Sequence, residues 1–391
     1  MDGSCVNYFL NIIKSVLNGT PFEADSSGID FETLYALSKM HQLAGVVGFC
    51  PDALKQMPAD IAQKFIYEKN RSISREAIQD AVVSEFLEKM EEAGFRAFLL
   101  KGICIKNMYP HPAIRYMTDT DILADEKDIE QIKPIWEELG LKFDHDSSHD
   151  MTFLSSQMVV ELHKNLISSI FGRMYEYYAD PWRFAVPIEG RQYIYEMSPE
   201  DLYVFAVGHL AKHYAGGGIG IKHIMDIYVM SKHEYDWDYI NAELEKLGLD
   251  RFARLAQKLA YSWFSEDETV EKDDMVAEFG FVILESGAFG KTEKRLASGI
   301  LFSKKKSNPK APKLKMALVR IFPSLEHMQM LYPALKKHAF LYPAFWLARA
   351  FDIVFNRRDL LKGIKCLAML EQDDIDDFAE RLKMAGIPED L

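Results

Sequence analysis

The stretch FRAFLLKGICIKNMYPHPAIRYMTDTDILA, residues 95–124, contains the change of pattern that decides the fold. Residues 95–100 form a compact apolar run of strand length, and Lys101-Gly102 follows directly, which is typical of a strand-to-helix turn. A short helix is predicted over residues 103–109, and the next apolar run, residues 118–124, predicts a second strand. The stretch therefore predicts a strand, a helix and a strand in close succession.

The sequence on either side predicts one small sheet between two helical regions. A helix is expected over residues 125–138, then short strands near 141–143 and 151–154, and a strand over 159–163 closes the predicted sheet. Apolar residues recur at helical spacing before the sheet, and Ser198-Pro199-Glu200-Asp201 after it is a helix start with serine at the cap and proline in the first turn. We expect an α+β fold in which a small mixed β-sheet core is flanked by N-terminal helices and a large helical C-terminal region. The expected domains are residues 1–93, 94–190 and 191–391.

Chain length bears on the number of packed units, and net charge bears on nucleic-acid binding. At 391 residues the chain exceeds the usual size of one hydrophobic core, so two or three packed units are expected. The formal net charge of −13 argues against non-specific binding of duplex nucleic acid, which depends on many basic side chains. The lysine run at residues 304–306 is typical of a solvated loop. The sequence therefore gives no strong indication of nucleic-acid binding.

Three features of the sequence indicate the cellular compartment of the protein. The first residues have an amphipathic helical pattern without the basic and then apolar order of a signal peptide. No apolar run reaches the roughly 18 residues of a membrane-spanning helix. The four cysteines are far apart and form no CxxC pair. We expect a cytoplasmic protein with no transmembrane segment.

Asp119 and Asp121 are the centre of the predicted site. Side chains two residues apart in a strand point to the same face, so the two carboxylates lie side by side while Thr120 and Ile122 face the other way. Adjacent carboxylates suit Mg²⁺ or Mn²⁺, and Mg²⁺ is held by one or two carboxylates together with substrate phosphates. A nucleoside triphosphate (NTP) is therefore the expected second partner.

Residues before and after this pair extend the predicted site. The turn at Lys101-Gly102 opens a helix whose free N–H groups can hold phosphate oxygens, and its glycine lets the backbone approach closely. Arg115 precedes the two aspartates and is a candidate for the same phosphates. Glu161 supplies a third carboxylate, and His163 shares its face of the strand. This polar pair either lies at an exposed edge or lines the site.

The sequence resembles the uncharacterised nucleotidyltransferase family of the DNA polymerase beta-type superfamily in three segments: LLKG at 99–102, RYMTDTDIL at 115–123 and VELH at 160–163. Residues 198–226 and 284–290 are similar to the helical part of that family. Two positions depart from the superfamily. Gly102 is followed by Ile103 where serine is usual, and the third carboxylate, Glu161, is an aspartate in many relatives.

The resemblance implies a metal-dependent transfer of a nucleoside monophosphate from an NTP to an acceptor that no motif identifies, with pyrophosphate leaving. It implies that Asp119 and Asp121 ligate the metal ions. Glu161 would complete the metal site and take the acceptor's proton. The residues expected to bind the metal-bound nucleotide are Lys101, Gly102, Arg115 and His163.

Two other functions and one other metal site stay open. A glycosyltransferase also places an Asp-x-Asp on a metal, although several strand–helix units normally precede it. A non-catalytic nucleotide-binding or scaffolding module would carry the same acids without activity. His209 and His213 lie one helical turn apart and resemble half a zinc site, with Asp226 as a third ligand. Leu210 stands where a zinc protease has glutamate, so packing or acceptor contact is the preferred interpretation.

Overall fold

The computed structural model describes residues 2–147, 149–267, 273–288, 290–304, 325, 328–329, 332, 334–355 and 358–391. The chain forms two compact units. The first consists of Met1–Lys212, Ile219–Ala288 and Ala385–Leu391, and the second of His213–Gly218 and Phe289–Met384. The predicted boundaries at residues 93 and 190 remain predictions.

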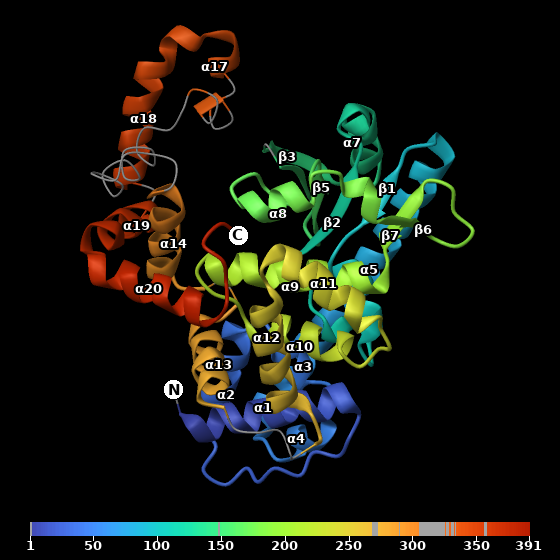
Figure 1. Ribbon diagram of the computed structural model, residues 1–391, viewed down its shortest axis with the longest axis vertical. Helices are drawn as coiled ribbons and strands as arrows, with labels where there is room; N and C mark the ends of the chain where they lie inside the picture. The colour runs from blue at the N-terminus through green and yellow to red at the C-terminus, as the bar shows by residue number, and fades with distance from the viewer. Residues whose placement is uncertain are drawn as a thin grey trace. The chain divides into compact units, whose positions relative to one another are not determined.

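One mixed sheet organises the first unit (Figure 1). Among the described residues it has seven strands in the order β3-β4-β5-β2-β1-β7-β6. Strand β2 runs parallel to β5 and antiparallel to β1, and β1 runs parallel to β7. The remaining neighbours are antiparallel. The strands are β1 Ala97–Leu99, β2 Asp119–Ala124, β3 Lys142–Asp146, β4 Asp150–Leu154, β5 Val159–His163, β6 Ala185–Pro187 and β7 Ile194–Met197.

Helices precede, connect and follow these strands. Those before the sheet are α1 Gly3–Asn18, α2 Phe31–Met40, α3 Ala44–Val47, α4 Pro51–Lys55 and α5 Ala59–Ala93. Those between strands are α6 Gly102–Ile105, α7 Ile129–Glu138 and α8 Gly172–Tyr177, with the 3-10 turns η1 Lys106–Met108, η2 Pro112–Ile114, η3 Glu126–Asp128 and η4 Pro181–Phe184. Those after it are α9 Pro199–Ala215, α10 Ile221–Met230, α11 Trp237–Leu247, α12 Asp250–Phe264 and α13 Asp274–Ser286.

The second unit is helical in its described residues. It contains α14 Thr292–Lys304, α17 Ala334–Lys337, η5 Ala339–Leu341, α18 Tyr342–Phe355, α19 Arg358–Met369 and α20 Gln372–Met384. The predicted lysine-rich loop extends beyond residue 304, where residues 305–324 lie outside the described part of the chain. No helix among the described residues combines the length and apolar character needed to cross a bilayer.

The main core of the sheet lies on one of its faces. Alternation along the strands directs one set of apolar side chains to this face, where helices α5 and α7 contribute to the same buried cluster. Trp136 of α7 stacks on Phe86 of α5 with ring centroids 3.6 Å apart, and both side chains are fully buried. Strand residues in this cluster include Ile122, Met151, Phe153, Val160 and Leu162. The intervening residues of β2 and β5 therefore point to the opposite face.

The predicted α+β class is confirmed, as are the strands at 97–99, 119–124 and 159–163. The expectation that residues 159–163 close the sheet is wrong, because β7 and β6 extend it on the far side of β1. Strands β6 and β7 are three and four residues long, which is too short for alternation to identify them. The pairing of β7 with β1 joins residues almost a hundred positions apart in the chain, at Ala97 and Ile194.

Candidate functional site

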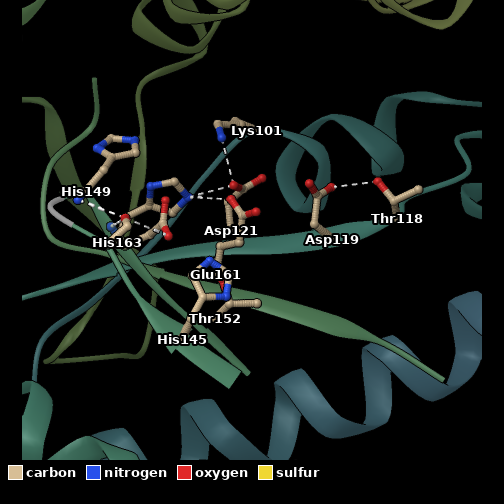
Figure 2. A network of polar contacts seen from close by, with 11 residues as sticks. Lys101, Thr118, Asp119, Asp121, His145, His149, Thr152, Glu161 and His163 are labelled. Carbon is tan, nitrogen blue, oxygen red and sulfur yellow. Dashed lines mark hydrogen bonds and ion pairs between the residues drawn. The ribbon is translucent and has the colours of Figure 1, made fainter. Parts of the chain in front are cut away.

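Asp121 is the most enclosed carboxylate of the predicted site. It lies on β2 and is 6% exposed. The Lys101 Nζ donates to its Oδ1 at 2.7 Å, and the His163 Nε2 lies 2.7 Å from the same oxygen. Figure 2 shows both side chains converging on Asp121 from different elements, the turn after β1 and the end of β5. The structure therefore brings together three residues that the sequence placed in the site.

The parallel pairing of β2 with β5 adds Glu161 to this group. Asp121 and Glu161 are direct register partners, so their side chains share one face. The His163 Nε2 lies 3.5 Å from the Glu161 Oε2. Ligand atoms of Asp121, Glu161 and His163 all lie within 4.8 Å of one another. The Glu161 side chain is 31% exposed, so it is the member of this group that solvent reaches.

Asp121, Lys101 and His163 shift one another's pKa values. Burial alone would raise the pKa of Asp121, but the positive charge of Lys101 and the hydrogen bond from His163 hold it well below its usual range. Burial opposes protonation of Lys101 and His163, yet the pKa of each is raised by Asp121. Asp121 is thus ionised, and its carboxylate is paired with the ammonium group of Lys101 and hydrogen-bonded to the ring of His163.

Asp119 lies outside this close group. It precedes Asp121 by two residues on the same face of β2, and the hydroxyl of Thr118 donates to its Oδ1 at 3.1 Å. In Figure 2 its carboxylate lies apart from the contacts around Asp121. The predicted adjacency of the two aspartates along the strand is present, while their joint binding of a metal ion stays a prediction.

The turn after β1 has a strained and crowded backbone. Lys101 has φ 49°, in the left-handed region that non-glycine residues rarely adopt. A Cβ added at Gly102 would stand 2.3 Å from the Arg115 Nη1 and 2.7 Å from the Met117 Sδ. Only glycine therefore fits here without movement of its neighbours. The predicted close approach at Gly102 is to these two side chains, and its contact with phosphate stays a prediction.

Arg115 forms a buried ion pair with Asp226. Its Nε and Nη2 each donate to the carboxylate of Asp226 at 2.8 Å, and the hydroxyl of Tyr109 donates to the same carboxylate at 2.6 Å. Arg115 is 7% exposed and Asp226 is 4% exposed. The structure therefore gives Arg115 a supporting position, and its predicted phosphate contact remains untested. The carboxylate of Asp226 thus accepts hydrogen bonds from both Arg115 and Tyr109.

Two lysines that the motif analysis did not select belong to the surroundings of the site. The pKa of Lys212 on α9 is lowered to about 8 by burial and by the charge of Lys101, against the attraction of Asp121 and Glu161. Burial and the charge of Arg115 lower the pKa of Lys222 on α10. Neither lysine forms a hydrogen bond or ion pair with another residue in the described ranges. No local signal marks such lysines, since ordinary surface lysines look the same in sequence.

Histidines also gather near the site. His149 lies just before β4, and its ring centroid is 4.9 Å from that of His163. Burial and the nearby charge of His163 lower the pKa of His149 to about 4. The ring of His223 on α10 is 5.9 Å from that of His209 on α9. Among the described residues, the groups suited to a metal ion include none of His209, His213 and Asp226.

The donor set of the carboxylate group fits a divalent cation. Asp121 and Glu161 offer hard oxygen ligands from adjacent strands, and Asp119 offers another on the same face. The ammonium group of Lys101 at Asp121 shows that this position stabilises positive charge. Mg²⁺ commonly binds through one or two carboxylates and completes its shell with phosphate and water. The residues present are therefore compatible with a magnesium-bound nucleotide.

Comparison with known proteins identifies a family for this chain. The sequence model of a family described as uncharacterised nucleotidyltransferases matches residues 27–265. The chain belongs to this nucleotidyltransferase family. The matched range spans the sheet, both aspartates, Glu161 and helices α9 and α10. Neither a curated protein nor a solved structure gives a significant match.

Membership in the nucleotidyltransferase family confirms the resemblance that the sequence segments indicated. It supports NTP transfer as the general activity and a nucleotide as the substrate class. The matched range also extends well before the sheet and includes all of α2 and all of α5. The N-terminal helices from residue 27 onward are thus part of what defines the nucleotidyltransferase family here.

Proposed function

We propose that this nucleotidyltransferase moves a nucleoside monophosphate from an NTP to an acceptor, releases pyrophosphate, and requires Mg²⁺ or Mn²⁺. The observation that carries the proposal is the pairing of Asp121 with Glu161 across parallel strands, with Asp119 on the same face. Carboxylates so arranged, in a chain of this family, are suited to a metal-bound triphosphate. Asp119, Asp121 and Glu161 would hold the metal.

When bound, the metal would neutralise charge on the phosphates and favour an ionised acceptor oxygen. Lys101 and His163 keep the Asp121 carboxylate ionised and fixed in place before any ligand arrives. A ligand group that is already oriented loses less freedom when it binds. Lys101 and His163 therefore act mainly as positioning residues for Asp121.

The proposed partners of the triphosphate include Lys212 and Lys222. Both are drawn from helices α9 and α10 and are influenced electrostatically by Asp119 and Asp121. A partly buried ammonium group without an anionic partner is costly. The phosphates of an NTP would supply the missing negative charge. This accounts for basic residues close to an acidic site in a chain with net charge −13.

The reaction forms a bond from the acceptor oxygen to the α-phosphorus and breaks the bond from that phosphorus to the oxygen bridging to the β-phosphorus. Pyrophosphate leaves with the electron pair of the broken bond. For an acceptor hydroxyl, the proton passes to a carboxylate oxygen. Two observations support Glu161 in this role: it is the more exposed carboxylate of the close group, and it lies beside Asp121.

Two conservative variants test the proposal and leave the buried ion pair of Lys101 and Asp121 intact. Asp119→Asn and Glu161→Gln keep side-chain shape, whereas loss of Asp121 would leave Lys101 and His163 buried without an anion. Calorimetry would measure binding of each of the NTPs with and without Mg²⁺. An NTP labelled at the α-phosphate would then reveal transfer to acceptors and release of pyrophosphate. We expect each variant to lower transfer by about a hundredfold or more.

Asp144→Asn is the matched control, since Asp144 is a half-exposed acid of the same sheet on β3. It should leave NTP binding unchanged. Binding of a sugar nucleotide in place of every NTP would contradict the proposal in favour of a glycosyltransferase. Absence of any nucleotide binding would contradict it in favour of a non-catalytic module.

A further inference from the structure

A second group of potential metal ligands lies on the other side of the His163 ring. His163 and Asp150 are direct partners in the antiparallel ladder of β5 with β4, so their side chains share one face. His149 is fixed next to them, because its backbone carbonyl accepts a hydrogen bond from the Lys164 amide at 2.9 Å. Ligand atoms of His149, Asp150 and His163 all lie within 4.8 Å of one another. Figure 2 shows the His149 ring close to His163 and on the far side from Asp119.

Two nitrogens of this group are buried without a hydrogen-bond partner. They are the Nδ1 atoms of His149 and His163, which have no partner among the described residues. His163 is 2% exposed, so water does not freely replace the missing partner. Buried polar atoms are nearly always satisfied in folded proteins. The two orphaned nitrogens therefore point to a ligand that accepts lone pairs from both.

We propose that His149, Asp150 and His163 bind a divalent transition metal ion, for which zinc is the best chemical fit. Two imidazoles and one carboxylate form a donor set that zinc favours and that the hard ion Mg²⁺ does not. Bonds of about 2.1 Å to a tetrahedral zinc place its ligand atoms about 3.4 Å apart. Ligand atoms within 4.8 Å need only a small closure to reach that spacing. A fourth position would remain for water.

The other nitrogen of His163 supports this assignment. Its Nε2 faces Asp121 at 2.7 Å and Glu161 at 3.5 Å. A metal-ligating histidine characteristically donates its second N–H to a carboxylate, which fixes the tautomer and ring orientation. Zinc at Nδ1 would displace the proton there and leave Nε2–H to donate to Asp121. The two metal sites would thus share one histidine, with His163 ligating zinc and only positioning Asp121.

This site goes beyond the proposed transfer reaction and does not depend on it. The zinc site uses one acid that the carboxylate site lacks, Asp150, and it leaves Asp119 unused. Variants at these positions can therefore separate the two sites. The zinc site is also testable by spectroscopy, independently of any activity.

The test uses the full chain, freed of metal by a chelator and titrated with Co²⁺ as a spectroscopic substitute for zinc. Nitrogen ligation in a near-tetrahedral site gives strong visible d–d absorption, and zinc should then displace cobalt at one ion per chain. We expect His149→Ala and Asp150→Asn each to weaken binding about tenfold to a hundredfold. Asp119→Asn and His145→Ala should leave it unchanged. His145 is an exposed histidine on β3 that is bonded to Asp144.

Three results would overturn the zinc site. One is the absence of cobalt or zinc binding at micromolar or tighter affinity. Another is binding that survives both His149→Ala and Asp150→Asn. The third is binding that disappears in Asp119→Asn, which would place the ion at the carboxylate site instead. If His149→Ala fails to fold by circular dichroism, the near-isosteric Asp150→Asn decides. Failure of NTP binding would leave these outcomes unaffected, so the two proposals fail separately.

Discussion

Removal of Asp226 should destabilise the protein far more than removal of Asp125, although each accepts two hydrogen bonds from one arginine. The Arg115–Asp226 pair has N–O distances of 2.8 Å for both bonds, and the Arg96–Asp125 pair has 2.8 and 2.7 Å. Their geometry is therefore matched. Their burial differs, with side chains 7% and 6% exposed in the first pair and 38% and 15% in the second.

The magnitudes follow from what each substitution leaves behind. Asp226→Ala would leave the buried guanidinium of Arg115 without an anion and Tyr109 without an acceptor, which costs about 3–5 kcal/mol of unfolding free energy. Asp125→Ala leaves Arg96 able to reach water and still stacked over Trp182 at 3.8 Å, so about 1 kcal/mol is expected. The larger cost of Asp226→Ala arises because the unpaired guanidinium of Arg115 is shielded from water, whereas that of Arg96 is not.

Guanidinium-induced unfolding followed by tryptophan fluorescence measures both variants under one condition. A double variant, Arg115→Met with Asp226→Leu, removes both buried charges and should recover much of the stability that Asp226→Ala loses. The reasoning is refuted if Asp226→Ala costs no more than Asp125→Ala. It also fails if the double variant is as unstable as the single one, because an uncompensated charge would then not be the cause.

Three further predictions concern the fold around the site. The pKa of buried His41 is lowered from 6.5 to about 4, so the unfolded chain takes the proton first and stability should fall by about 3 kcal/mol as pH drops from 7 to 4. Urea unfolding at several pH values should show this loss in the wild type and a smaller one in His41→Gln. Gly102→Ala should cost about 1–3 kcal/mol in chemical unfolding because of its clash with Arg115, whereas Gly363→Ala, which meets nothing within 4 Å, should not destabilise. Trp136→Ala should cost about 3–5 kcal/mol in the same assay, and Trp136→Phe much less, because its indole N–H has no partner among the described residues.

Local pattern was enough to predict the elements that carry the site. The apolar run ending at Lys101-Gly102 and the run containing Asp119 and Asp121 are both strands, with a short helix after the turn. Alternation also predicted that Ile122 faces away from the aspartates, and Ile122 belongs to the core cluster. These features depend on residues a few positions apart, so the sequence encodes them directly. The later strands β6 and β7 lacked enough residues to show any period.

The sequence by itself determined which residues are acidic or basic, which face of a strand each occupies, and that Asp119, Asp121 and Glu161 are candidates for one site. Only the tertiary structure decided their partners. His163 meets Asp121 from 42 residues away, and Arg115 turns to Asp226 from 111 residues away. Such pairs depend on strand register and on how distant helices pack, which no local period specifies. For the same reason only the fold placed His149 and Asp150 against the free side of His163.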